Sequence, residues 1–327
     1  MRRGQIRRAI AGAFAVVFSV ALAGDMNCVW AQSPPGTAGN GSVVTARPVT
    51  IPLTIRVKGE APTNELELKT VDFTVSEDGD PQTPLSIRAM GSNWPINLFV
   101  LIQDDLVSSV GLEMKSLAEF IRRLPRGSRV SVGYLRTGSL QLRQKFTTDL
   151  ERAAKSLRPP NGLASSAPYN PYVEVIEALR RFDSQAAGRR AILLVSDGLD
   201  ISRGVDSSSV GQSVDLQRAI NESQRRGVAV YAFFAPTVTS EGRLNLLADA
   251  QGSLNKLAEE TGGRAYFQGF GAPTSFNPFI KDLKASLDMQ IALTYLSTHP
   301  KKGFHRVKIV SSTPGVAVTY PAGYTRN

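Results

Sequence analysis

The pattern of apolar and polar residues changes character twice along the chain. Short segments that alternate between apolar and polar positions occupy residues 49–92 and 291–327. In the first of these, an Asp-Gly pair at residues 78–79 lies between two alternating segments and indicates a hairpin. Residues 95–290 instead combine short apolar runs with amphipathic helical patterns. The sequence therefore predicts an α/β domain between two β-rich flanks.

The central region contains apolar runs of strand length, separated by helical patterns. These runs cover residues 97–103, 129–135, 190–196, 228–234 and 264–267. Strand and helix in alternation favour a mainly parallel sheet with helices on both faces. Residues 141–147 follow a strand after a short turn, which favours one antiparallel edge strand. We expect a Rossmann-like, doubly wound, mainly parallel sheet at 95–290, with 291–327 packing against 49–92 as a small β-rich unit.

The amino terminus has the features of an export signal. Arginines at positions 2, 3, 7 and 8 precede the apolar run IAGAFAVVFSVALAG, and cleavage is expected after Ala23 or Ala31. This run is shorter than the roughly 20 residues that span a bilayer. We expect a signal peptide at 1–31, a flexible linker at 32–48, and no stable membrane span after cleavage. The chain is thus predicted to be exported, to the periplasm or the extracellular space.

Composition and charge narrow the class of partner. Apolar residues make up 42% and charged residues 20% of the 327 residues, as in ordinary globular proteins. The net charge is +10, but the basic residues are scattered as pairs, whereas nucleic-acid binding needs a clustered basic surface. We therefore expect a protein or cell-envelope ligand and no nucleic acid. The sequence does not indicate an oligomeric state.

The candidate chemistry lies directly after two of the predicted strands. The segment QDDLVSS (103–109) follows the first apolar run, and DGLD (197–200) follows RAILLVS. In an open parallel sheet, ligands bind beyond the carboxyl ends of the strands. We expect Asp104 and Asp197 to face one crevice there. Carboxylate and hydroxyl oxygens suit a hard cation, so Mg²⁺ or Mn²⁺ is the candidate cofactor.

These segments resemble the von Willebrand factor A domain. That family follows its first strand with D-x-S-x-S, has a threonine on a middle loop, and follows its fourth strand with a DG pair. The segment LAEETGGRAYF (257–267) is similar to the end of such domains. The flanking VDFTVSEDGDPQTPLSI and the terminal PAGY resemble the exported VWFA-related acidobacterial domain family. The resemblance implies a metal-ion-dependent adhesion site.

Carried onto this sequence, the family's metal ligands are only partly present. Asp104, Ser108 and Asp197 match the first aspartate, the second serine and the later aspartate, and are the predicted metal ligands. Leu106 stands where the first serine belongs, and Asp105 is a possible substitute ligand.

The segment that corresponds to the family's middle loop also differs from the family pattern. Residues 161–172 contain no threonine, so that Ser165 or Ser166 would have to supply its hydroxyl. The resemblance thus implies a degenerate adhesion site.

Enzymatic motifs are absent from the sequence. The two histidines, His299 and His305, lie in the carboxyl-terminal β segments, and no G-x-S-x-G, H-E-x-x-H or C-x-x-C motif occurs. We expect a non-catalytic binding or adhesion module that recognises its partner through loops at the carboxyl edge of the sheet, including the polar loop 200–213. Two alternatives are an envelope scaffold with a vestigial site and a metal-assisted hydrolase.

Overall fold

The computed structural model describes residues 46–57, 72–186, 188–204, 213–237, 240 and 243–326. The predicted signal peptide, nearly all of the predicted linker and residues 205–212 of the polar loop lie outside the described residues. Residues 44–327 form one compact unit.

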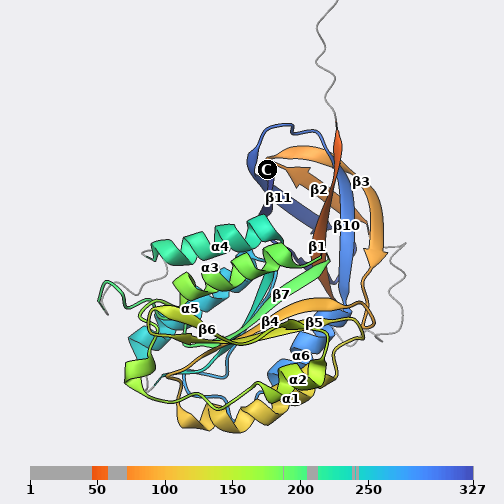
Figure 1. Ribbon diagram of the computed structural model, residues 1–327. Coiled ribbons are helices and arrows are strands. Elements are labelled where there is room, and N and C mark those ends of the chain that lie inside the picture. The colour runs from red at the N-terminus through yellow and green to blue at the C-terminus, as the bar shows by residue number, and fades with distance from the viewer. Residues whose placement is uncertain are drawn as a thin grey trace, which may run out of the picture. The chain divides into compact units, whose positions relative to one another are not determined.

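A six-stranded mixed sheet occupies the central part of the chain (Figure 1). Its strands are β4 (Ile96–Gln103), β5 (Arg129–Arg136), β6 (Ser139–Thr147), β7 (Arg189–Ser196), β8 (Ala229–Phe234) and β9 (Ala265–Tyr266), in the order β6-β5-β4-β7-β8-β9. All neighbours pair in parallel except β6, which runs antiparallel to β5. The predicted apolar strands are confirmed to within about two residues at their ends.

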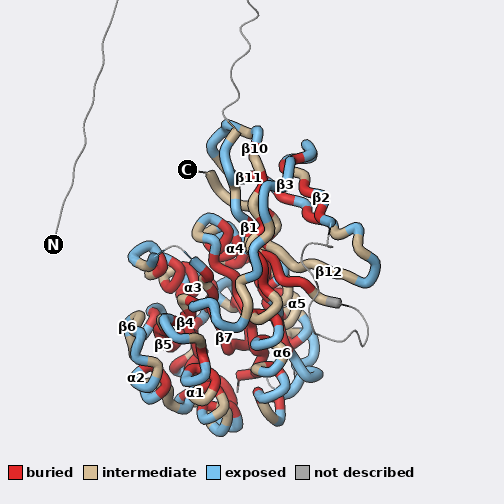
Figure 2. Tube along the Cα trace, turned by 90° about the vertical axis from the view of Figure 1, so that its right-hand side faces the viewer, coloured by how far each residue is buried: buried red, intermediate tan, exposed pale blue. Residues whose placement is uncertain are grey.

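Helices cover both faces of this sheet. One face carries α1 (Met114–Arg122), α2 (Leu150–Lys155) and α6 (Asn277–Asp288), and the other carries α3 (Pro171–Arg180), α4 (Val214–Arg226) and α5 (Leu244–Glu260) (Figure 1). Successive side chains of a strand point to opposite faces. Val100 therefore packs in one core and Phe99 in the other. The strands between these cores are almost wholly buried (Figure 2).

The two flanks of the chain form a second, seven-stranded sheet. Its strands are β1 (Arg47–Val57), β2 (Phe73–Glu77), β3 (Asp80–Ala89), β10 (Gln290–Ser297), β11 (Gly303–Ser311), β12 (Val316–Thr319) and β13 (Gly323–Arg326). Every pairing is antiparallel, in the order β12-β1-β10-β3-β2-β11-β13. The predicted hairpin is confirmed, since Asp78 and Gly79 form a two-residue turn with φ of 52° and 98°.

The predicted fold class is wrong. We expected a mainly parallel Rossmann-like sheet with a small β-rich unit beside it, but the larger of the two sheets is antiparallel and the other is mixed. The cause is the interleaving of the flanks. Strand β10 lies between β1 and β3, so seven short strands share one sheet and bury their own apolar cluster, including Leu53, Val75 and Leu293.

A close backbone approach holds β9 beside β8. A Cβ atom at Gly263 would lie 1.9 Å from the backbone oxygen of Val230. We expect Gly263→Ala to force these strands apart and to lower the free energy of unfolding by about 3 kcal/mol. Circular dichroism should record a fall in Tm of roughly 5–10 °C. Gly271→Ala is the control, because a Cβ there meets no atom within 4 Å. An equal fall in both variants would contradict the close approach.

Candidate functional site

The predicted site residues follow neighbouring parallel strands. Strands β4 and β7 pair in register, with Ile102 opposite Val195. Their carboxyl ends therefore meet at one edge of the sheet, and so do the residues that follow each strand. Asp104, Asp105 and Asp197 are all buried at this edge. Their side chains nevertheless have different partners.

Asp104 is neutralised by an arginine. Its carboxylate is fully buried and accepts two hydrogen bonds from the Arg158 guanidinium, at 2.6 and 2.9 Å. Asn161 donates to the same carboxylate from its backbone N–H at 3.1 Å and from its side-chain amide at 2.8 Å. Arg136 adds an ion pair at 3.5 Å. Both carboxylate oxygens of Asp104 thus have hydrogen-bond partners, and Arg158 supplies the nearest positive charge.

Arg158 is itself held in position by Tyr134. The guanidinium carbon lies 4.0 Å from the centre of the tyrosine ring. The Tyr134 hydroxyl donates to the backbone oxygen of Arg158 at 2.6 Å and accepts from its N–H at 2.7 Å. The hydrogen bond to Asp104 raises the pKa of Arg158 above its usual value. A planar guanidinium anchored in this way forms a paired contact that a flexible side chain would hold poorly.

Asp105 faces the opposite way, toward Asp197. Burial, together with the negative charge of Asp197, raises the pKa of Asp105 to about 7, although a hydrogen bond from Gln103 at 2.9 Å opposes both effects. Close to neutral pH, Asp105 is therefore partly protonated. Partial protonation of one acid reduces the repulsion between two neighbouring buried carboxylates.

Asp197 is held by hydroxyl and backbone donors. It accepts from the Thr237 hydroxyl at 3.0 Å and from the backbone N–H of Leu199 at 3.1 Å. Ser240 lies 2.9 Å from the Thr237 hydroxyl and extends this network. Burial raises the pKa of Asp197 above its usual value, and these hydrogen bonds oppose the rise. Asp105 and Asp197 are thus two neighbouring buried acids, each held by hydrogen bonds from other residues.

The remaining predicted residues do not join this network. Ser108 is exposed, and among the described residues it makes no hydrogen bond to Asp104 or Asp197. Leu106 is buried, and its backbone pairs with that of Thr237. In the middle loop Ser165 is exposed, whereas Ser166 is buried. A metal held jointly by Asp104, Ser108 and Asp197 thus stays a prediction.

Thr237 and Gln103 are the residues that the sequence reasoning missed. Thr237 follows β8, the neighbour of β7, and Gln103 ends β4. Gln103 accepts from the Ser196 hydroxyl and from the backbone N–H of Asp197 at 3.3 Å. Their positions in the sequence could have indicated them, because each is a polar residue at the carboxyl end of a buried strand.

The cavity at this edge is small. It has a volume of about 30 Å³ and is lined by Asp105, Asp197, Thr237 and Arg243 among others. A water molecule needs about 10–15 Å³ of such space. The enclosed space at this edge can therefore hold a water molecule or a small ion.

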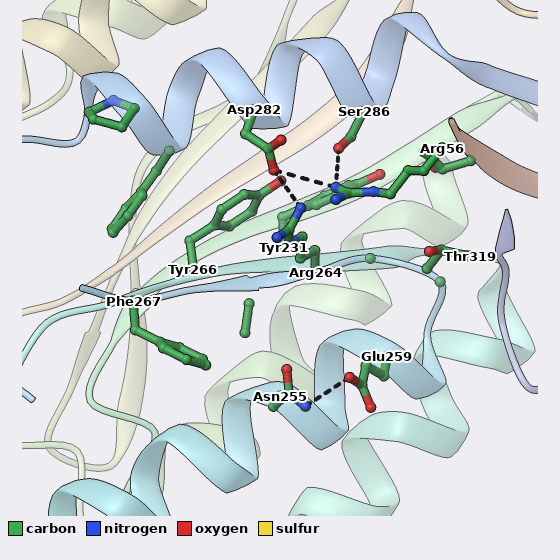
Figure 3. Close-up of a pocket in the computed structure, with 16 residues that line it drawn as sticks. Arg56, Tyr231, Asn255, Glu259, Arg264, Tyr266, Phe267, Asp282, Ser286 and Thr319 are labelled. Carbon is green, nitrogen blue, oxygen red and sulfur yellow. Dashed lines mark hydrogen bonds and ion pairs between the residues drawn. The ribbon is translucent and has the colours of Figure 1, made fainter. Parts of the chain in front are cut away.

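A larger cavity lies between the two sheets, bordered by β1, β9, α5 and α6 (Figure 3). Its volume is about 560 Å³. Asp282 accepts from Arg264 at 2.9 Å and from Arg56 at 3.4 Å, and Arg56 also donates to Ser286 at 2.9 Å. These groups pair with one another between the two sheets. The contacts of Arg56 with Asp282 and Ser286 therefore connect β1 to α6.

One group of side chains in the described part of the chain is close enough to hold a metal ion. It consists of Glu77, Asp78 and His305, whose ligand atoms lie within 4.8 Å of one another. These residues belong to the seven-stranded sheet and lie in none of the segments predicted to bind a metal.

Comparisons with known proteins give the following results. No family model matches the sequence, and no curated protein matches it. Among solved structures, the chain is similar to an aerotolerance-related membrane protein from Bacteroides fragilis that carries multiple mutations to serines. The TM-score is 0.41 and the sequence identity is 15%, and the match covers 59% of this chain and 98% of that chain. BatB from Bacteroides thetaiotaomicron, a conserved hypothetical protein, has a TM-score of 0.40 and 12% identity over 58% and 97%. A human COPII-coat protein has a TM-score of 0.41 and 11% identity over 72% of this chain and 44% of that chain.

Within the described residues, none of the helices has the length and apolar character required to cross a membrane.

The Asp104–Arg158 pair is predicted to be essential for stability. We expect Arg158→Met to leave the buried Asp104 carboxylate with only the more distant Arg136, at 3.5 Å, and to lower the free energy of unfolding by about 3–5 kcal/mol. Adding Asp104→Asn should recover much of that loss, because the charge is then removed. Urea unfolding measures both effects. Arg123→Met is the control, since Arg123 is 77% exposed and forms a surface ion pair worth at most about 1 kcal/mol. A double variant no more stable than Arg158→Met would contradict the assignment.

Asp105 is predicted to make the protein less stable as the pH rises. Its pKa is 3.8 in the unfolded chain and about 7 in the folded protein. Between these values the folded state binds more protons, so the free energy of unfolding falls as the pH rises from about 4 to 7. We expect Asp105→Asn to remove this part of the dependence, on the order of 4 kcal/mol by pH 8. The check is the free energy of unfolding of wild type and variant, measured by urea unfolding at several pH values between 4 and 8. The same pH dependence in both proteins would contradict the raised pKa of Asp105.

Proposed function

We propose that the chain is an exported, non-catalytic module that binds a protein partner through the carboxyl edge of its six-stranded sheet. The proposal of export rests on the arginine-rich, apolar amino terminus. The proposal of binding is also favoured by the resemblance of residues 95–290 to the von Willebrand factor A domain. The observation that carries it is the distribution of exposed apolar side chains.

Large apolar side chains gather around this edge. Twelve of them are exposed among the described residues, and eight belong to segments at the carboxyl ends of the central strands: Leu112, Leu163, Tyr169, Val173, Val214, Leu244, Phe267 and Phe270. We call these eight residues the apolar rim. The other four are Leu85, Trp94, Phe304 and Val310. Exposed apolar residues concentrated on one face favour contact with another protein.

Hydrogen bonds connect the segments that carry the rim. The backbone oxygen of Tyr169 accepts from Ile201 at 2.9 Å, and Asn170 donates to Asp215 at 2.9 Å. The backbone N–H of Gly162, next to Leu163, donates to the backbone oxygen of Asp104 at 3.0 Å. The Arg158 and Asn161 contacts with Asp104 therefore brace the loop that presents Leu163. A preorganised apolar surface loses little conformational entropy on binding.

Recognition through a bridging metal has less support. The Asp104 carboxylate is already bound to Arg158, and Ser108 is exposed. We propose that the adhesion site is degenerate and that Mg²⁺ or Mn²⁺ is not needed for binding. A metal-assisted hydrolase is disfavoured for the same reason, because the acids at this edge are committed to internal partners and the cavity between them is small.

A paired substitution tests the apolar rim. A partner is first identified by photo-crosslinking from position 169 in the native cell envelope, and its Kd for the purified chain is then measured. We expect Leu163→Ser with Tyr169→Ser to weaken binding by at least about tenfold, because both side chains are about 60% exposed and lose apolar contact area. Chelation of divalent metals should leave Kd unchanged.

The matched control is Leu85→Ser with Val310→Ser. These exposed side chains lie on β3 and β11 of the other sheet. The control should bind like the wild type. Loss of binding in the control alone would favour the envelope-scaffold alternative, in which the seven-stranded sheet docks, and would overturn the proposal.

A further inference from the structure

We propose that Glu77, Asp78 and His305 form a binding site for a divalent transition-metal ion of the Zn²⁺ class. The site lies where the β2–β3 hairpin meets β11 and the carboxyl-terminal strand β13, close to the end of the chain (Figure 1). It is separate from the acids at the edge of the six-stranded sheet.

The first argument is the arrangement of atoms around the His305 ring. Its Nε2 lies 2.8 Å from the backbone oxygen of Lys301, which can only accept a hydrogen bond, so Nε2 carries a proton. Its Nδ1 lies 2.7 Å from Asp78 Oδ2 and 3.4 Å from Glu77 Oε1. A neutral imidazole would point its lone pair at two carboxylates. A proton, on the ring or on a carboxyl group, or a metal ion must therefore lie there.

The second argument is the unfilled coordination of Glu77. Its side chain is fully buried. Oε1 accepts from the Tyr324 hydroxyl at 2.8 Å and from Ser297 at 3.0 Å, whereas Oε2 has no hydrogen-bond partner. A buried carboxylate oxygen without a partner is costly. A cation bound by both oxygens of this carboxylate would remove that cost.

The surroundings have the features expected around a metal-bound histidine. Such a histidine commonly donates its other ring N–H to a backbone carbonyl, as Nε2 does here. The ring also stacks on Tyr324, with centroids 5.4 Å apart. His299 borders the group, and its Nδ1 lies 3.7 Å from Glu77 Oε1 without a hydrogen-bond partner.

The donor set selects the class of metal. One imidazole nitrogen with two carboxylates suits Zn²⁺ better than Mg²⁺ or Ca²⁺, which prefer oxygen ligands only. Ligand atoms of a tetrahedral Zn²⁺ site lie about 3.3 Å apart. The 3.4 Å between His305 Nδ1 and Glu77 Oε1 matches this value. The 2.7 Å between His305 Nδ1 and Asp78 Oδ2 would have to lengthen when the ion binds. Because Asp78 is 36% exposed, an ion can enter from its side.

Metal binding would connect residues that are distant in the sequence. Glu77 pairs with Val307 across β2 and β11, and His305 pairs with Tyr324 across β11 and β13. An ion at this point would fix the hairpin turn to the carboxyl-terminal strands. We therefore expect the ion to stabilise the seven-stranded sheet.

Titration of the full chain, without an affinity tag and after treatment with a chelator, tests the proposal. We expect one Zn²⁺ per chain with a micromolar or lower Kd, and a rise in Tm of about 4–5 °C at a free concentration of 100 times Kd. Mg²⁺ at millimolar concentration should have no such effect.

Nuclear magnetic resonance locates the ion without any substitution. The chain contains only two histidines, so ¹⁵N-histidine labelling reports on this cluster alone. One equivalent of Zn²⁺ should shift the Nδ1 resonance of His305 to that of a metal-bound nitrogen, while Nε2 stays protonated. Unchanged histidine resonances in the presence of Zn²⁺ would overturn the proposal and leave a proton as the cation between the carboxylates.

A matched pair of substitutions completes the test. Asp78→Asn should weaken Zn²⁺ binding by at least about 10–100-fold. It should also fold, because asparagine tolerates the positive φ of 52° at this turn. Asp80→Asn makes the same chemical change two residues away, where the side chain contacts His299 at 3.1 Å, and should keep the affinity within a few-fold. Equal Zn²⁺ affinity in Asp78→Asn and wild type would overturn the proposal.

Discussion

The edge of the six-stranded sheet is organised by the need to compensate a buried negative charge. Asp104 is fully buried, and an isolated carboxylate in such a place is too unfavourable to persist. The chain supplies Arg158 from the segment after α2 and Asn161 from the following loop. These bonds fix the loop that borders the edge and position the residues beside it. Much of the proposed binding surface thus depends on one ion pair.

Three carboxylates at the same edge are stabilised in three different ways. Asp104 has an arginine, Asp105 has a raised pKa and an amide donor, and Asp197 has hydroxyl and backbone donors. A shared metal ion would have compensated all three together. Here each carboxylate has partners within the chain, and the proposed contact with another protein rests on the exposed apolar residues. The carboxylate Glu77 differs, because one of its buried oxygens has no internal partner.

Local patterns in the sequence were sufficient for the elements and for the general position of the site. Apolar runs with helical segments between them located the central strands, and the Asp-Gly pair located the hairpin at residues 78–79, because these features depend on neighbours in the sequence. The same patterns indicated that polar residues follow β4 and β7. They did not indicate that the flanks interleave into the larger sheet, since strand order depends on contacts across more than 200 residues.

The identity of each side chain's partner was decided only by the tertiary structure. Asp104 and Asp105 are adjacent and chemically identical, yet one faces Arg158 and the other Asp197, because successive residues at the end of a strand point in opposite directions. His305 was placed by the sequence only in a carboxyl-terminal β segment, and the structure buries it against Glu77. The sequence by itself determined which residues carry charge and where strands end. The long-range packing decided which charges meet, because electrostatic pairing depends on distance in space.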